Sequence, residues 1–205
     1  MIEAKEQLVL KCALAEFSEH GYRNASTNRI VKAADTSKGI LFHYFGSKKQ
    51  LMLTVLDQSL DVFDQYLENE MKELPPELLA RYLALSKAKV KMFMEFPMIY
   101  KLVSDVFREV PEELGEEIVI RQRRMQERYA ATFLEDADYS AFSPEFEREK
   151  VVQLIHSVLD QLTHRFMEQF KHAPDRGLSE LPNIIREFEE HTDMLKKGIY
   201  KNDSR

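Results

Sequence analysis

The sequence has few of the residues that build disulfide frameworks, metal clusters or loop-rich folds. Its 205 residues include one cysteine, six glycines, seven prolines and no tryptophan. The single Cys12 excludes an intramolecular disulfide and any metal site made of paired cysteines. No run reaches the roughly 18 apolar residues of a membrane span, and no apolar stretch follows the N-terminal Met-Ile-Glu-Ala-Lys. We therefore expect a cytoplasmic protein without a signal peptide.

Catalytic signatures are missing as well. The six histidines show no His-Glu-x-x-His or other metal-ligand spacing. We find no nucleophile–base motif, no carboxylate pair and no glycine-rich phosphate loop. The sequence therefore predicts no enzyme, no metal and no cofactor.

Charge is present but unevenly distributed. The net charge is -6, yet the first 50 residues carry a balance of +3 and the other 155 a balance of -9. Only the N-terminal segment therefore suits a phosphate backbone. With 44% hydrophobic residues, the chain can also bury a core.

Apolar residues recur at helical spacing throughout, without sustained strand-like alternation. In the first helix, Leu10, Ala13, Leu14 and Phe17 form one stripe. We expect an all-α fold of about nine helices, near residues 3–20, 27–34, 38–45, 47–72, 77–96, 98–109, 112–135, 144–172 and 182–200, with a loop at 173–181. The predicted domains are a helix-turn-helix DNA-binding domain at 1–46 and a ligand-binding and dimerisation domain at 47–205.

The segment from Ser26 to Leu51 has the arrangement of a helix-turn-helix. The polar turn Asp35-Thr36-Ser37 joins two short helices, and a longer helix precedes them. In the second short helix Leu41 and Phe45 lie four residues apart and can pack inward. The residues left at the surface or its rim are Lys38, Gly39, Ile40, Phe42, His43 and Tyr44.

These residue types suit a DNA groove. Lys38 can reach a guanine edge or a phosphate, and Gly39 allows a close backbone approach. His43 and Tyr44 can donate to phosphate oxygens, which fixes register without reading sequence. Lys48 adds its charge to the backbone N–H groups of a helix start, as a phosphate clamp. The alternative, that the aromatic run is core, is disfavoured by the adjoining lysines and glycine.

One set of positions in residues 9–51 carries a family resemblance: Phe17, Gly21-Tyr22, Ser26-Thr27, Ile30, Ala34, the run 37–45, and Ser47-Lys48 through Leu51. With these positions the segment resembles the TetR family of bacterial one-component transcriptional regulators. The resemblance implies that Thr27 and Asn28 contact phosphate, and it leaves an additional contact to a base open. It also implies that the DNA face is lined by Lys38, Gly39, Ile40, Phe42, His43, Tyr44 and Lys48.

Three positions depart from the family pattern. Asp35 stands where the turn glycine is usual, and aspartate tolerates the left-handed backbone conformation. Thr36 replaces an aliphatic residue, which predicts looser packing of the turn. Phe42 replaces a common tyrosine, which removes one hydroxyl from the DNA face.

A stretch rich in methionine and aromatic residues covers residues 92–100. Ordinary core packing would explain it, but helices four to eight of the resembled family enclose a ligand cavity. A mostly apolar cavity with a few polar groups is typical of a small-molecule site. The pocket residues that we predict are Phe63, Tyr66, Tyr82, Met92, Phe93, Phe96, Tyr100, Phe107, Tyr129, Phe133, His156 and Leu159.

The last two long helices are apolar over a wide arc, which indicates packing on two sides. Two such helices from each of two chains form a four-helix bundle across a two-fold axis. The predicted interface residues are Val151, Ile155, Val158, Leu162, Phe166, Ile184, Phe188 and Leu195. A purely internal core is the alternative.

These patterns together predict a homodimeric repressor that a small-molecule effector releases from a pseudo-palindromic operator in double-stranded DNA. Its two recognition helices are expected to enter successive major grooves, about 34–36 Å apart or a multiple of that distance. A DNA-binding activator, or an adaptor without an effector, stays open as the alternative.

Overall fold

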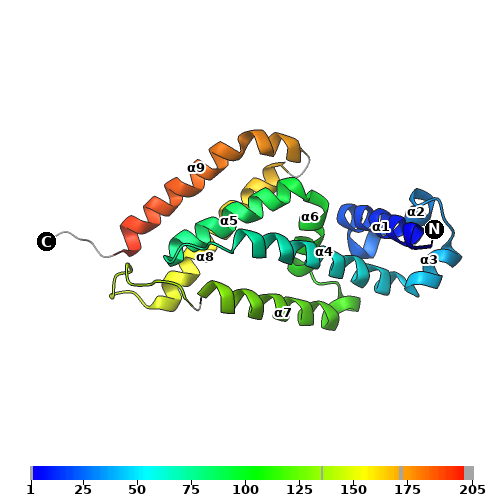
Figure 1. Ribbon diagram of the computed structural model, residues 1–205, viewed down its shortest axis with the longest axis horizontal. Coiled ribbons are helices and arrows are strands. Elements are labelled where there is room, and N and C mark those ends of the chain that lie inside the picture. The colour runs from blue at the N-terminus through cyan, green and yellow to red at the C-terminus, as the bar shows by residue number, and fades with distance from the viewer. Residues whose placement is uncertain (1, 135, 171–172, 201–205) are drawn as a thin grey trace. The chain divides into compact units, whose positions relative to one another are not determined.

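The computed structural model describes residues 2–134, 136–170 and 173–200, and its regular elements in these ranges are all helices (Figure 1). They are α1 (Ile2–Asn24), α2 (Thr27–Ala33), α3 (Lys38–Phe45), α4 (Lys48–Glu70), α5 (Leu78–Glu95), α6 (Pro97–Arg108), the short 3-10 helix η1 (Glu112–Leu114), α7 (Gly115–Leu134), α8 (Arg148–Phe170) and α9 (Pro174–Ile199). The predicted all-α fold is confirmed. Within the described ranges, no helix has both the length and the apolar character of a membrane span.

The chain divides by packing into two compact units. The first comprises Met1–Gln65 and Phe96–Met125, and the second comprises Tyr66–Glu95 and Gln126–Arg205. Helices α4 and α7 therefore contribute residues to both units. The boundary predicted after residue 46 divides a DNA-binding from a ligand-binding function. It differs from this division by packing and stays a prediction.

Helix α1 holds the first unit together, because it packs against both α2 and α6. The predicted stripe supplies this contact, with Leu10, Ala13 and Phe17 buried. Gly21 has a positive φ of 68°, but helical residues resume after it up to Asn24. The kink folds the end of α1 back, so that the Tyr22 ring stacks 6.4 Å from that of Phe17.

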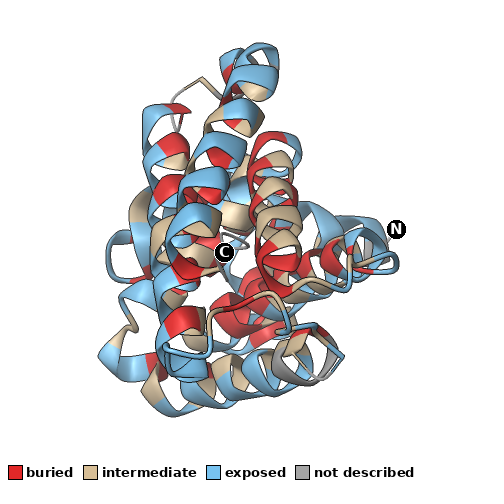
Figure 2. Cartoon of the chain, turned by 90° about the vertical axis from the view of Figure 1, so that its left-hand side faces the viewer, coloured by how far each residue is buried: buried red, intermediate tan, exposed pale blue. Residues whose placement is uncertain are grey.

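The second unit is built on α5, which packs against α8 and α9, and these two helices also pack on each other. Buried residues lie on the faces that the helices turn toward one another, as Figure 2 shows. Met92 of α5, Ile155 of α8 and Phe188 of α9 are fully buried there. Much of the apolar surface seen in the sequence is therefore buried between helices of the same chain.

Residues 174–181, predicted to be part of a loop, form the beginning of α9, so that prediction is wrong. Pro174 stands in the first turn, where the missing N–H is not needed. Pro182 lies inside the helix and removes one hydrogen bond. The helix continues through this proline, and its N-terminal part packs closely on α5: a Cβ at Gly177 would lie 2.9 Å from the Met94 Cε. Tertiary packing in the second unit thus overrides the local proline signal.

Helix α8 begins at Arg148 and not at the predicted Pro144. The preceding residues are held by the end of α9 instead of by helical bonds. Ser143 donates its backbone N–H to the Ile199 carbonyl at 2.9 Å, and the Phe142 ring lies 5.3 Å from that of Tyr200. These contacts fix a turn where the sequence pattern predicts the first turn of a helix.

Candidate nucleic-acid interface

Both short helices begin after a serine N-cap. The Ser26 hydroxyl accepts the Arg29 backbone N–H at 3.5 Å, and the Ser37 hydroxyl accepts that of Ile40 at 3.3 Å. Serine is a favoured N-cap because its oxygen satisfies an N–H that the helix leaves free. Gly46 ends α3 with φ of 70°. Local sequence therefore sets both ends of the recognition helix.

The turn between α2 and α3 accommodates its unusual residues. Asp35 adopts φ of 44°, the left-handed conformation expected of it. The Thr36 hydroxyl is buried, and no hydrogen-bond partner is recorded for its Oγ1. A buried hydroxyl without a partner costs stability, so the threonine weakens the turn, whereas the looser packing expected there stays a prediction.

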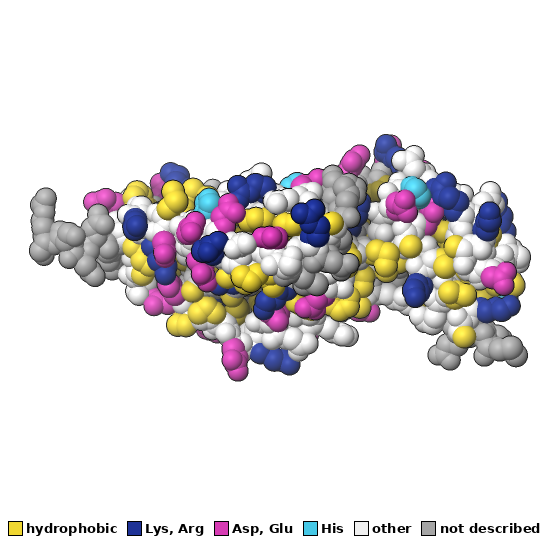
Figure 3. Space-filling model, turned by 90° about the horizontal axis from the view of Figure 1, so that it is seen from above, with side chains coloured by type: hydrophobic (Ala, Val, Ile, Leu, Met, Phe, Trp, Pro, Cys, Tyr) yellow, Lys and Arg dark blue, Asp and Glu magenta, His cyan; other side chains and the backbone are white. Residues whose placement is uncertain are grey.

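Helix α3 presents its polar and aromatic side chains outward. Leu41 and Phe45 are 0% and 5% exposed, so they anchor the helix as expected. Among the predicted DNA-face residues, Lys38, Gly39, Phe42, His43 and Asn28 are exposed, and Ile40, Tyr44, Thr27 and Lys48 are half-buried. Lys and Arg side chains stand out on the surface of the N-terminal helices in Figure 3. The face is available to a DNA duplex.

The rings of α3 support one another. The His43 and Tyr44 rings lie 5.7 Å apart, and the Tyr44 ring meets that of buried Phe45 edge-on at 6.1 Å. Edge-on aromatic pairs are favourable and restrict ring rotation. Tyr44 is therefore steadied by a buried neighbour while its ring stays at the rim of the exposed face.

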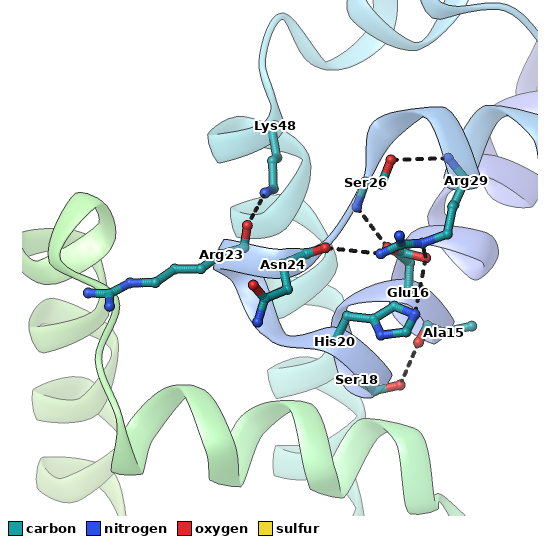
Figure 4. Close-up of polar contacts among 9 residues, drawn as sticks. All are labelled: Ala15, Glu16, Ser18, His20, Arg23, Asn24, Ser26, Arg29 and Lys48. Carbon is teal, nitrogen blue, oxygen red and sulfur yellow. Dashed lines mark hydrogen bonds and ion pairs between the residues drawn. The ribbon is translucent and has the colours of Figure 1, made fainter.

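Lys48 is drawn back against α1 (Figure 4). Its Nζ donates to the Arg23 carbonyl at 3.2 Å and lies 4.9 Å from the centroid of the Tyr22 ring. Burial lowers the pKa of Lys48 below its usual value, although the charges of Glu113 and Glu16 act in the opposite direction. The ammonium thus already binds the protein at the position where we predict a phosphate clamp.

Replacing Lys48 by alanine is expected to weaken binding to every duplex and to reduce the slope of log affinity against log salt by about one phosphate contact. Titrations at several salt concentrations measure this slope. Lys49→Ala is the matched control, because Lys49 pairs with Glu117 at 2.7 Å. An unchanged slope in Lys48→Ala would limit Lys48 to packing α4 on α1.

A polar junction that the sequence pattern did not reveal ties the helix-turn-helix to η1 and α7 within the first unit. The Tyr22 hydroxyl donates to the Glu113 carboxylate at 2.8 Å. Burial, together with this carboxylate, raises the pKa of Tyr22 to about 12. Lys49 Nζ donates to the Glu113 carbonyl at 2.9 Å and pairs with Glu117. The C-terminal end of α1 and the start of α4 are therefore bound to η1 and to the first turn of α7.

The predicted pocket residues fall into both units. In the second unit, the Tyr82 ring packs 4.8 Å from that of Phe133 and 6.1 Å from the exposed His156. In the first, the Phe63 and Tyr100 rings lie 5.9 Å apart. The other members are the buried Met92, Phe93 and Leu159, the half-buried Tyr66, Phe107 and Tyr129, and the exposed Phe96. A shared ligand pocket stays a prediction.

The predicted interface residues lie mainly inside the second unit. Six are buried in the chain's own packing: Val151, Ile155, Leu162, Phe166, Ile184 and Phe188. Val158 and Leu195 are half-buried and line an open groove of about 560 Å³ between α8 and α9. Its other lining residues are Phe146, Lys150, Val151, Leu154, His191, Met194, Gly198 and Ile199. The groove is apolar, and the sequence pattern missed its exposed members.

Residues 9–55 match the family model of the bacterial regulatory proteins, tetR family. The HTH-type transcriptional regulator RutR of Escherichia coli strain K12 is 30% identical over 101 residues, which are 49% of this chain and 47% of RutR. The match thus spans about half the length of that protein. The HTH-type transcriptional repressor AcnR of Corynebacterium glutamicum is 23% identical over 186 residues, covering 87% of this chain and 89% of AcnR.

Solved structures share the whole fold at low identity. A TetR family transcriptional regulator from Chloroflexus aurantiacus has a TM-score of 0.72 and 18% identity, over 98% of this chain and 95% of that one. The transcriptional regulator FadR from Bacillus subtilis, in complex with stearoyl-CoA, has a TM-score of 0.63 and 12% identity, over 89% and 97%. These likenesses show that the fold extends through both units.

Proposed function

We propose that this chain, whose residues 9–55 match the family model of the bacterial regulatory proteins, tetR family, is a cytoplasmic DNA-binding regulator of that family and not an enzyme. It binds a pseudo-palindromic operator as a homodimer and represses transcription there. A small-molecule effector releases it. The similarity to AcnR, which is named as a repressor, supports repression.

The exposed face of α3 is the observation that carries this proposal. Lys38, Gly39 and His43 are open to solvent on a helix that Leu41 and Phe45 anchor from below. A short helix of this kind fits the major groove, where base edges are distinguishable. The exposed aromatic and cationic side chains of this short helix do not contribute to the core of the chain, which favours a binding role for them.

Release requires that effector binding reach the helix-turn-helix. In the first unit, α1 packs against α6 and its Tyr22 contacts Glu113 of η1, while Lys49 of α4 pairs with Glu117 of α7. A ligand that shifts α6 or α7 therefore moves the DNA-binding helices. A near-complete switch needs the effector to prefer the released form by about 5.5 kcal/mol.

Aromatic and apolar side chains support a small-molecule site among the helices after α3. Burial, with the charges of Glu95 and Glu70, raises the pKa of Tyr66 to about 12, so its hydroxyl stays a neutral donor. FadR from Bacillus subtilis is in complex with stearoyl-CoA. A long-chain acyl-CoA is therefore the first effector to test on this chain.

The experiment starts with duplexes selected by the protein from a random library. A repressor of this kind should enrich two inverted half-sites, and the affinity should be measured at a stated salt concentration because DNA binding depends on it. Addition of acyl-CoA should then release the selected duplex. Enrichment of no sequence would contradict DNA recognition, and enrichment without release by any tested ligand would favour the adaptor without an effector.

Replacing Lys38 by alanine is expected to change sequence preference as well as affinity. A side chain that donates to a guanine edge contributes about 1–3 kcal/mol of discrimination at one base pair. Binding to operators mutated at each position measures this effect, with Lys32→Ala as the control because Lys32 is exposed on α2. Equal weakening on all duplexes would make Lys38 a phosphate contact.

A further inference from the structure

A buried carboxylate of α1 closes the first turn of α2 (Figure 4). Glu16 is 8% exposed, and its Oε1 accepts the backbone N–H of Ser26 at 2.7 Å. The same carboxylate accepts Arg29 Nε at 2.9 and 3.0 Å and also binds Arg29 Nη2. Arg29 Nη2 donates in addition to the Asn24 carbonyl at 2.9 Å. One network thus joins α1, the corner after it and the start of α2.

This network satisfies the same N-terminal N–H groups as a capping box, but its acceptors come from two helices. In a capping box, the residue three positions after the N-cap returns a carboxylate or amide oxygen to the N-cap N–H. Here Ser26 is the N-cap and that residue is Arg29, whose side chain can only donate. Glu16 supplies the missing acceptor from α1 and binds Arg29 as well.

The charges make the two residues depend on each other. A cation in the first turn of a helix is disfavoured by the helix dipole, and Glu16 compensates the charge of Arg29. Burial raises the pKa of Glu16, but the hydrogen bonds from Arg29 and Ser26 outweigh it and hold the pKa below its usual value. The carboxylate is therefore ionised at neutral pH.

We propose that Glu16 and Arg29 are positioning residues for DNA recognition. They fix the angle at which α2 leaves α1, and α2 carries the Thr27 and Asn28 side chains and leads directly into α3. Recognition surfaces must be held within about 0.5 Å and 10–20° of the productive geometry. This inference rests on the proposed DNA binding, and it adds two residues that need touch neither base nor phosphate.

The test compares Glu16→Gln with Glu19→Gln. Each variant removes one negative charge from α1, and Glu19 is exposed. By charge alone, both variants should bind DNA equally or more tightly. Positioning predicts the opposite sign for Glu16→Gln alone: affinity for the selected operator falls by about 10-fold or more, while affinity for unrelated duplex is unchanged or higher.

Arg29→Lys is the second variant, because it keeps the charge and loses the planar fork that the carboxylate binds. We expect the same selective loss of operator affinity with an unchanged salt slope. Thermal melting checks that each variant is folded at the assay temperature. If Glu16→Gln is unfolded there, Arg29→Lys decides alone.

Three results would overturn the inference. The first is Glu16→Gln behaving like Glu19→Gln, and the second is equal weakening on operator and unrelated duplex. A fall in salt slope by about one in Arg29→Gln, with Arg29→Lys unchanged from wild type, would instead make Arg29 a phosphate contact and also overturn it. Failure of the wild-type protein to select any duplex would refute the proposed function and is seen before any variant is made.

Discussion

Replacing Arg81 by methionine is expected to lower the free energy of unfolding by about 3 kcal/mol. Arg81 is 6% exposed, and its guanidinium donates to three backbone carbonyls: Pro75 at 2.8 Å, Phe133 at 2.9 Å and Asp136 at 2.9 Å. Methionine fills the space of the side chain but leaves these carbonyls without their donor. Without Arg81, its hydrogen bonds would no longer join the loop before α5 to the end of α7 and to the residues that follow α7.

Thermal or denaturant unfolding measures the change, which corresponds to a melting temperature lower by about 6–12 °C for a chain of this size. Arg165→Met is the control in the same unit, because Arg165 is exposed and forms a surface ion pair with Glu187. Such pairs contribute about 0–1 kcal/mol. Equal melting temperatures for the two variants would contradict the role assigned to Arg81.

Much of the helix-turn-helix could be predicted because its signals are local. Ser26 and Ser37 cap the helices whose first turns follow them, and Gly46 ends α3 with the positive φ that glycine favours. Leu41 and Phe45 are buried as their spacing of four predicts. Each of these outcomes depends on residues within one turn of one another.

The two-helix cap was missed because its parts are distant in sequence. Glu16 lies on the inner side of α1 next to buried Phe17, where a periodicity count treats a carboxylate as an interruption. Its partner Arg29 reads as an ordinary basic residue of a DNA-binding segment. A hint was present: Ser26 has no acidic or amide residue three positions later, so its backbone N–H needs an acceptor from elsewhere.

The sequence could not show which apolar residues of α8 and α9 are buried within the chain and which stay exposed, for a different reason. The period of apolar residues shows that a helix has a wide apolar arc, but not which part of the arc its own chain covers. Leu162 is 6% exposed because α8 packs on α5 and α9, whereas Leu154, two turns earlier, is 44% exposed. Only the packing of the whole unit separates the internal part of the arc from the open part.

Replacing Met194 by glutamate is expected to dissociate the proposed dimer and to lower operator affinity by about 100-fold or more. Met194 is 69% exposed and lines the apolar groove of α8 and α9. In a two-fold interface each substitution occurs twice, and a buried carboxylate without a partner costs several kcal/mol. A monomer engages one half-site only and loses the gain in affinity from binding both half-sites together.

Sedimentation at several protein concentrations and operator titration measure the two effects separately. Lys197→Gln is the matched control, since it makes the same change in net charge at an exposed position of α9. Leu162→Glu would not serve, because a charge inside the chain's own core disrupts folding before association. An intact dimer of Met194→Glu would show that the interface lies outside the groove. A folded monomer with full operator affinity would show that binding does not require two half-sites.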